Sequence, residues 1–263
     1  MPSVLAGGHR LEYVRLRPAR PGRPELVFLH EGLGSVSLWR DFPARVAAAT
    51  GCGALVYSRW GYGASDPLPG DRPVRFMHDE ALSTLPELLD RLRVDRPILV
   101  GHSDGGSIAL IHAAASGRPV AGLVLLSPHV LVEEISVRSI AAARVAFEAT
   151  DLRARLARHH QDVDGAFWGW NRVWLDPAFR SWNIEELLPR VSCPVLAIQG
   201  RQDEYGTMAQ IEKIAAAVPG TELLPLDACG HSAHRDQPEA VIAAIARFVD
   251  RVARPEQGRP LAG

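Results

Sequence analysis

A serine lies between a predicted strand and a predicted helix at residues 101–106. The stretch is Gly101-His102-Ser103-Asp104-Gly105-Gly106. The apolar run 98–100 before it predicts a buried strand, and residues 107–114 after it predict a helix. Small residues let the chain turn tightly there, so that the serine oxygen projects from the sheet edge beside the helix N-terminus. We interpret Ser103 as a nucleophile; the alternative is a glycine-rich turn in an ordinary strand-to-helix connection.

A serine nucleophile needs a base to accept its proton and a carboxylate to orient that base. In enzymes with this serine turn the three residues follow one another as serine, acid and histidine. Asp203 follows the apolar run 194–199, and His231 follows the run 222–226. Both positions come at the carboxyl ends of predicted strands, as Ser103 does, so we expect the three side chains at one edge of the sheet.

Other residues compete for these two roles. Glu204 is the alternative acid, and His234 is the alternative base, although we expect His234 at a helix entry or pocket rim. We expect His30 and His102 to pack or to form hydrogen bonds, and the pair His159-His160 to face solvent. His231 and His234 have no third ligand nearby, so no metal is expected.

The oxyanion formed during acyl transfer needs hydrogen-bond donors. The sequence predicts the backbone N–H groups of Asp104, just after the nucleophile, and of Gly32, in the turn after the strand 25–30, with Glu31 as the alternative to Gly32. Gly32 also has a simpler reading as an ordinary turn glycine.

Apolar runs and helical spacing alternate through most of the chain, which predicts a mostly parallel sheet covered by helices on both faces. A cap at Asp236, followed by Pro238 and Glu239, predicts the start of the last helix. Strands are predicted at 3–6, 11–17, 25–30, 54–58, 97–100, 120–126, 194–199 and 222–226, and helices at 37–49, 76–92, 107–114, 208–218 and 238–252.

The alternation stops at residues 130–189, where helical segments and no clear strand are predicted. We therefore expect a core domain of residues 1–129 and 190–253, a helical lid (cap) of residues 130–189 over the carboxyl edge of the sheet, and a flexible tail at 254–263. Four of the six tryptophans lie in residues 167–182 of the lid. They either line an apolar pocket or attach the lid to the core. Trp168, Trp170, Trp174 and His129 are the expected substrate contacts.

Composition excludes several classes of protein. The 263 residues carry 29 Lys and Arg against 30 Asp and Glu, a net charge of −1, so no nucleic-acid partner is expected. The chain has neither a long apolar run nor a secretion signal, and its three cysteines are widely spaced, so we expect no membrane partner, no disulfide framework and a cytoplasmic protein. No phosphate-cradling loop is present, and no cofactor is expected.

These motifs together resemble the α/β-hydrolase fold, in its group of lid-bearing esterases and carbon–carbon-bond hydrolases. The resemblance covers about residues 25–250 except the lid, and implies Ser103 as nucleophile, Asp203 as acid and His231 as base. The matching segments are His30 to Gly34, Arg59 to Ser65, Gly101 to Gly106, Gly200 to Asp203, and Gly230-His231 followed by Asp236 to Glu239.

Two residues depart from the family's pattern. Glu31 stands where members of this group usually carry glycine, and Asp104 where they often carry an apolar residue. Because two carboxylates would oppose a developing oxyanion, we expect both side chains to face away from Ser103 and to be held by nearby donors. Arg59 or the arginines at 153–158 could bind a substrate carboxylate or a coenzyme A tail, although exposed arginines usually only face water.

The sequence therefore predicts a serine hydrolase that cleaves carboxylic esters or thioesters of apolar, including aromatic, acids through an acyl-enzyme. The partner is a small-molecule substrate. Alternatives are hydrolysis of a carbon–carbon bond in a ring-cleavage dienoate, a lactonase and, outside enzymes, a ligand-binding receptor on a hydrolase fold.

Overall fold

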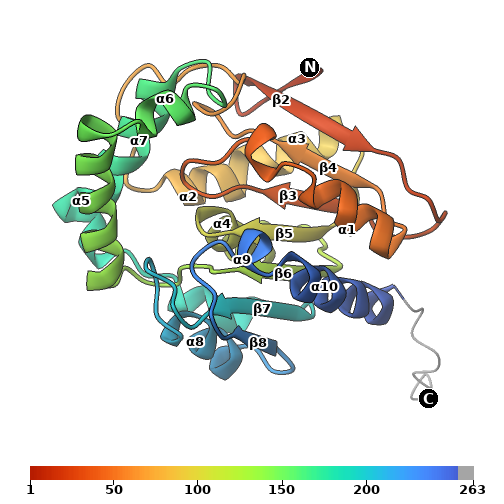
Figure 1. The fold of residues 1–263 in the computed structure, drawn as a ribbon. Helices are drawn as coiled ribbons and strands as arrows, with labels where there is room; N and C mark the ends of the chain where they lie inside the picture. The colour runs from red at the N-terminus through yellow and green to blue at the C-terminus, as the bar shows by residue number, and fades with distance from the viewer. Residues whose placement is uncertain (254–263) are drawn as a thin grey trace, which may run out of the picture.

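An eight-stranded sheet forms the centre of the protein in a computed structural model that describes residues 1–253 (Figure 1). The strand order is β1-β2-β4-β3-β5-β6-β7-β8, in which β1, β2 and β4 pair antiparallel and all other neighbours pair parallel. The predicted mostly parallel sheet is confirmed. The strands are β1 Ser3–Ala6, β2 His9–Leu16, β3 Leu26–Leu29, β4 Ala54–Tyr57, β5 Ile98–His102, β6 Gly122–Leu126, β7 Val195–Gly200 and β8 Glu222–Leu226.

Helices cover both faces of the sheet, so the central strands are buried on both sides and appear in the sequence as continuous apolar runs. In β3, Leu26 and Phe28 face the core under α1 and α10, whereas Val27 and Leu29 face the core on the other side. The helices of the sheet region are α1 Phe42–Thr50, α2 Phe76–Asp79, α3 Leu85–Arg91, α4 Asp104–Ala115, α8 Ala209–Ala217, α9 Ala233–Asp236 and α10 Pro238–Val252.

Three predicted helices differ in detail. The helix at 37–49 is divided into a short 3-10 turn, Ser37–Trp39, and α1, because Arg40 has φ 54°. The helix at 76–92 contains a π turn at Glu80–Thr84, just before Pro86, which has no N–H to continue the regular ladder. Asp236 does not cap α10: it ends α9, and its carboxylate accepts from the Gly230 N–H at 2.8 Å.

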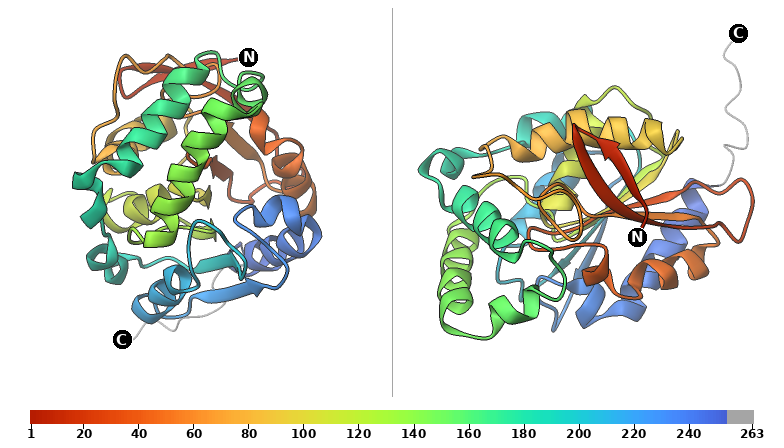
Figure 2. Two further views of the ribbon diagram at one scale, coloured as in Figure 1. Left: turned by 60° about the vertical axis from the view of Figure 1, so that its left-hand side comes forward. Right: turned by 90° about the horizontal axis from the view of Figure 1, so that it is seen from above.

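The segment between β6 and β7 is helical, as predicted, and lies at the end of the sheet where α4 begins (Figures 1 and 2). Its two ends meet in a single antiparallel bridge between Leu131 and Asn183, and the Ile184 N–H donates to the Val130 carbonyl at 2.8 Å. We call residues 130–189 the helical insertion. It contains α5 Glu134–Ala149, α6 Leu152–Leu156, α7 Val163–Leu175 and the 3-10 turns Pro177–Ser181 and Glu185–Arg190.

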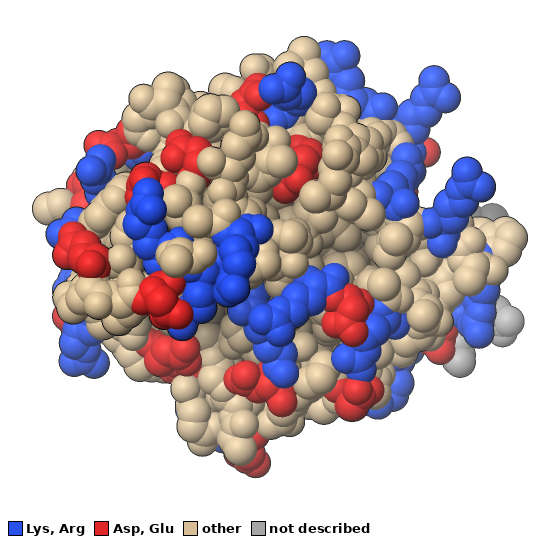
Figure 3. Space-filling model, turned by 45° about the horizontal axis from the view of Figure 1, so that its top comes forward, with Lys and Arg blue, Asp and Glu red and all other residues tan. Residues whose placement is uncertain are grey.

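Acidic and basic side chains lie next to one another on the face shown in Figure 3. Surface ion pairs join separate elements; for example, Arg172 lies 2.9 Å from Asp71, which joins α7 to the loop after β4. Within residues 1–253, no helix is both long enough and apolar enough to cross a membrane. Cys52, Cys193 and Cys229 are free thiols. The predicted tail, 254–263, lies outside the described residues.

A substitution at Gly105 tests how the sheet and α4 fit together. A Cβ atom there would lie 2.0 Å from the Leu29 carbonyl oxygen, so we expect Gly105→Ala to lower the free energy of unfolding by about 3 kcal/mol or more. Gly70→Ala is the matched control, because a Cβ at Gly70 meets nothing within 4 Å. Urea unfolding of both variants measures the difference, and equal stability would contradict the close approach.

Candidate active site

Ser103 occupies a strained turn between β5 and α4. Its backbone has φ 53° and ψ −119°, a conformation that L-residues rarely adopt and that clusters at functional sites. The Ser103 N–H donates to the Leu126 carbonyl at 2.9 Å, and the Ser103 carbonyl accepts from the Gly106 N–H at 2.8 Å. A Cβ at Gly101 would lie 2.3 Å from the Gly105 carbonyl oxygen, so the turn closes only with glycine there. The serine therefore lies at the N-terminus of α4, as predicted.

Asp203 and His231 meet at the carboxyl ends of β7 and β8. The Nδ1 atom of His231 lies 2.8 and 2.9 Å from the two carboxylate oxygens of Asp203. Asp203 also accepts from the Tyr205 N–H at 2.8 Å and from the Gln199 side chain at 2.8 Å. A carboxylate beside Nδ1 places the proton on that atom, which leaves Nε2 of His231 as the free basic nitrogen.

The environment of this pair shifts both pKa values toward the charged forms. Burial alone would raise the pKa of Asp203, but the hydrogen bond and charge of His231 outweigh burial and lower it. Burial alone would lower the pKa of His231, but the hydrogen bond and charge of Asp203 raise it above its usual 6.5. Glu204, the alternative acid, accepts from the His231 backbone N–H at 3.2 Å instead of from its ring.

His129 is the side chain that bonds Ser103. Its Nε2 atom lies 3.3 Å from the Ser103 Oγ atom, and its ring centroid lies 5.8 Å from that of His231. The sequence predicts His129 as a substrate contact, whereas the structure places it on the predicted nucleophile. The signal in the sequence was the position of His129 just after the predicted strand 120–126, and the structure adds that this strand, β6, lies next to β5.

The peptide between Glu31 and Gly32 is held from its carbonyl side. The Glu31 carbonyl accepts from Nδ1 of His30 at 2.6 Å and from the Arg59 guanidinium at 3.0 Å. The Arg59 backbone N–H donates to Nε2 of His30 at 3.0 Å, which fixes the His30 tautomer with its proton on Nδ1. Since carbonyl and N–H point in opposite directions in a trans peptide, the Gly32 N–H faces away from Arg59.

Asp104 is buried in an ionic cluster beneath Ser103. Its Oδ1 atom accepts from the Trp174 indole N–H at 3.2 Å, and its Oδ2 atom lies 3.6 Å from the Arg59 guanidinium. Burial raises the pKa of Asp104, and the positive charge of Arg59 opposes that rise. Arg59 is therefore a buried partner of Asp104 and not a free cation for a substrate carboxylate, as had been considered.

Glu31 lies between polar groups of two other elements. One carboxylate oxygen lies 3.4 Å from Nδ1 of His102, and the other lies 3.5 Å from the Arg235 guanidinium of α9. Burial would raise the pKa of Glu31, but these neighbours outweigh burial and hold it well below its usual range. Both unusual carboxylates are thus engaged by nearby donors, as expected from the sequence.

Two of the three tryptophans named as substrate contacts lie against the predicted site. Trp170 covers Gly32 so closely that a Cβ at Gly32 would lie 2.1 Å from the indole nitrogen. Trp174 contacts His129 edge to face, with centroids 5.0 Å apart, in addition to its bond with Asp104. Trp168 instead packs inside the insertion, edge to face against the stacked rings of Phe147 and Phe167 and within 5.5 Å of two arginine guanidinium groups.

His160 differs from the expectation, whereas His234 lies at a helix entry, one of the two positions expected for it. His160 is buried and not solvated: its Nδ1 accepts from the Gly63 N–H at 3.0 Å, and its Nε2 donates to the Leu33 carbonyl at 2.9 Å. These bonds attach the insertion to the loops after β3 and β4. His234 is in the short helix α9, as expected for a helix entry, but it is buried against Trp39 and Phe42 and not at a pocket rim.

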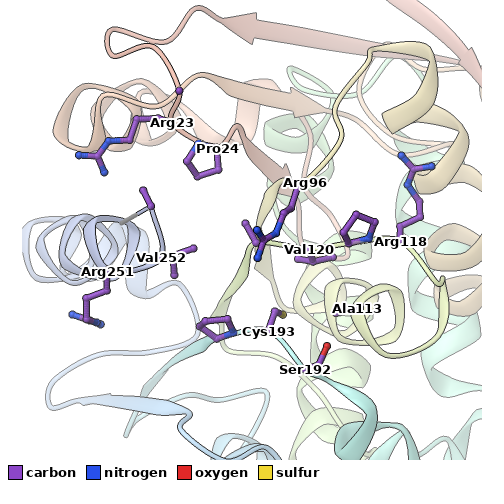
Figure 4. A pocket seen from close by; sticks show the side chains of 15 residues that line it. Arg23, Pro24, Arg96, Ala113, Arg118, Val120, Ser192, Cys193, Arg251 and Val252 are labelled. Carbon is purple, nitrogen blue, oxygen red and sulfur yellow. The ribbon is translucent and has the colours of Figure 1, made fainter. Parts of the chain in front are cut away.

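A groove of about 1050 Å³ lies at the opposite, amino-terminal ends of β5, β6 and β7 (Figure 4). Four arginines line it, but three of them pair with carboxylates, for example Arg118 with Asp90 at 2.7 Å. The groove is therefore separate from Ser103, and its charge is largely compensated by neighbouring acids.

Comparison with known proteins gives one family. The model of the alpha/beta hydrolase family matches residues 26–244. Among curated relatives, the putative carbamate hydrolase RutD of Pseudomonas savastanoi is 29% identical over 236 residues, covering 81% of this chain and 89% of that protein. The proline iminopeptidase of Saccharolobus solfataricus is 23% identical, covering 91% of this chain and 89% of that protein.

Solved structures share the fold at lower identity. A structure from a study of carboxylesterases of Nitrososphaera gargenis has a TM-score of 0.77 at 19% identity, covering 95% of this chain and 98% of that one. The enol-lactonase of Burkholderia xenovorans has a TM-score of 0.75 at 20% identity, covering 95% of this chain and all of that one.

The pKa of His231 tests the pairing with Asp203. In the wild type we expect the His231 ring to titrate above 6.5, and in Asp203→Asn we expect its pKa to fall, because the raising charge is lost while burial remains. Histidine NMR signals followed from pH 4 to 10 measure both values. Glu204→Gln is the matched control and should change the pKa of His231 less; a larger change in that variant would make Glu204 the orienting acid.

The buried contacts of Asp104 with Arg59 and Trp174 are expected to contribute to the free energy of unfolding. Asp104→Ala leaves the Arg59 charge buried without its carboxylate, and we expect a loss of about 3–5 kcal/mol. Trp174→Phe removes mainly the indole N–H bond to Asp104 and should cost about 1–3 kcal/mol. Chemical denaturation measures both losses. A smaller loss in Asp104→Ala than in Trp174→Phe would show that the contact with Arg59 does not stabilise the fold.

Proposed function

Because the chain belongs to the alpha/beta hydrolase family, we propose that it is a serine hydrolase cleaving carboxylic esters or thioesters of apolar, including aromatic, acids through an acyl-enzyme on Ser103. The observation that carries the proposal is the convergence of two features at one sheet edge. One is Ser103 with φ 53° at the start of α4, and the other is the buried pair of Asp203 and His231. A strained serine and a carboxylate-oriented imidazole at the same sheet edge supply the nucleophile and the base that acyl transfer needs. In the structure the Ser103 Oγ atom bonds His129, and the proton transfer to His231 is part of the proposal.

In the proposed reaction the Ser103 Oγ atom attacks the substrate carbonyl while its proton passes to Nε2 of His231. Asp203 keeps the other ring nitrogen protonated and stabilises the imidazolium. The carbonyl electron pair moves to oxygen, where the N–H groups of Gly32 and Asp104 stabilise it. Collapse of the intermediate expels the alcohol or thiol, which takes the proton from His231. Water then attacks the acyl-enzyme with the same base and releases the acid.

The oxyanion-hole assignment is supported by how the two donors are held. Arg59 and His30 bond the carbonyl of the Glu31–Gly32 peptide, so rotation of that peptide would break both bonds. Asp104 is the first residue of α4, and its N–H has no intrahelical acceptor. The carboxylates of Asp104 and Glu31 do not cancel the stabilisation of the oxyanion, because Arg59 and Arg235 offset their charges.

The helical insertion, residues 130–189, is proposed as a lid over a core of residues 1–129 and 190–253. Trp170 on Gly32 and Trp174 against His129 support a substrate site lined by aromatic side chains, which favours an apolar acyl group. We propose Trp170, Trp174 and His129 as substrate contacts. The contacts of Trp168 favour packing within the lid. The free cysteines fit a reducing compartment such as the cytoplasm.

Labelling with a fluorophosphonate tests the nucleophile. We expect the wild type to be labelled, Ser103→Ala not to be labelled, and turnover to fall by about 10⁴-fold or more in that variant. Ser116→Ala, at the other end of α4, is the matched control and should label as the wild type does. Equal labelling of Ser103→Ala and the wild type would refute Ser103 as the nucleophile.

A panel of substrates assayed with the wild-type protein tests the substrate class. A panel of aryl esters, acyl thioesters, lactones, carbamates and a vinylogous dienoate, assayed for kcat/KM, should give the highest values for aryl esters or acyl thioesters of apolar acids. Preference for a lactone, a carbamate or the dienoate would keep the serine mechanism and replace the proposed substrate. Labelling without turnover of any panel member would refute the ester and thioester assignment.

A further inference from the structure

We propose that His129 is a second catalytic histidine, which donates a hydrogen bond from Nε2–H to the Ser103 oxygen, orients the serine hydroxyl toward His231 and stabilises the charge on that oxygen when it leaves the acyl-enzyme. The inference deepens the proposed function and rests on Ser103 being the nucleophile. Its first observation is the distance of 3.3 Å between the His129 Nε2 and Ser103 Oγ atoms.

The ring of His129 is held rigidly. Ser107, one turn after Ser103 in α4, accepts from the His129 N–H at 3.2 Å and donates to the His129 carbonyl at 2.7 Å. The next N–H, of Val130, donates to the Gln210 side chain at 2.7 Å. The ring itself lies edge to face against Trp174. A side chain fixed in this way can define one rotamer of the serine hydroxyl.

His129 cannot replace His231 as the base. Its exposed fraction is only 2%, and its Nδ1 atom is buried without a hydrogen-bond partner in the part of the chain that the structure describes. Burial, together with the charge of His231, lowers the pKa of His129 to about 3. A nitrogen with so low a proton affinity does not accept the serine proton at neutral pH.

A neutral imidazole carries one proton, on either Nδ1 or Nε2. Only one of these two tautomers of His129 supports the proposed reaction. If Nε2 accepted the serine hydroxyl, the proton would point away from His231 and the reaction would be inhibited. If Nε2 carries the proton, His129 donates to Oγ and the serine proton is directed to His231. When the acyl–Oγ bond breaks during deacylation, the electron pair returns to Oγ, where the same donor stabilises it. The proton that Oγ regains then comes from His231, and that of His129 stays in place.

The groups that face His129 are few and identified. They are Ser103 in the turn before α4, Ser107 of α4, Trp174 of α7 and His231 after β8. Asp203 after β7 and His102 of β5 act on the ring from further away. No carboxylate bonds its Nδ1 atom among residues 1–253. The proposal gives these two rings, His129 and His231, whose centroids lie 5.8 Å apart, opposite proton roles at the Ser103 oxygen.

Nitrogen-15 NMR of the histidines tests the proposal independently of activity. We expect His129 to be an Nε2–H tautomer that does not titrate between pH 5 and 9, and its Nε2 resonance to shift in Ser103→Ala. A proton on Nδ1, or an Nε2 signal unmoved by Ser103→Ala, would overturn the proposal. This measurement tests the tautomer and the hydrogen bond of His129 separately from the labelling experiment, which tests Ser103 as the nucleophile and with it the proposed function.

Kinetics measure the consequence of the bond. His129→Phe keeps an aromatic ring at this position but removes the N–H donor. We expect deacylation of an aryl ester to slow by about tenfold or more, with a burst of the released phenol and little change in KM. His129→Gln can place an amide N–H near the Nε2 position and should recover part of the rate. His112→Asn, a buried histidine further along α4, is the control. Equal deacylation rates in wild type and His129→Phe, with both folded by circular dichroism, would overturn the catalytic role.

Discussion

The close approach of α4 to the end of β3 is the constraint on which the site depends. The Leu29 carbonyl oxygen occupies the space that a side chain at residue 105 would need. This contact sets the nucleophile turn, at the N-terminus of α4, beside the turn after β3 that carries Gly32. The strained backbone of Ser103 costs about 1–3 kcal/mol. Backbone bonds from Ser103 to Leu126 and from Gly106 and Ser107 to Ser103 offset that strain within the same contact.

Charge beneath the site is balanced across segments that are distant in sequence. Asp104 in α4 meets Arg59 from the loop after β4, and Glu31 meets Arg235 from α9. A carboxylate next to a nucleophile would hinder an oxyanion if it stood alone, since two negative charges at short distance repel strongly in a buried site. Arg59 offsets the charge of Asp104 and at the same time bonds the Glu31 carbonyl. One buried guanidinium therefore compensates a charge and orients a peptide.

The sequence predicted the sheet, the tight turn at Ser103 and the pairing of Asp203 with His231, because each depends on local pattern and on which strand ends share an edge. It did not predict the hydrogen bond of His129 to Ser103 or the burial of His160. Predicting the bond of His129 requires the knowledge that β6 is the neighbour of β5. His160 belongs to an arginine-rich stretch whose composition indicates a solvated helix. Burial of a polar residue in the insertion depends on where the insertion lies on the core, and local periodicity carries no information about that.

The partner of each imidazole nitrogen separates structural from reactive histidines in this fold. In His30 and His160 both ring nitrogens are engaged by backbone groups, so neither has a nitrogen left for chemistry. His231 has a carboxylate on Nδ1, which raises its pKa and frees Nε2 to accept a proton. His129 has no such carboxylate, and its lowered pKa keeps it neutral; in the proposed tautomer its Nε2–H donates to the serine oxygen. Histidine thus serves here as a tether or, in the proposed reaction, as a base or a donor, according to its hydrogen-bond partners. The proton positions proposed for His129 and His231 would let both act on one serine oxygen without competing for its proton.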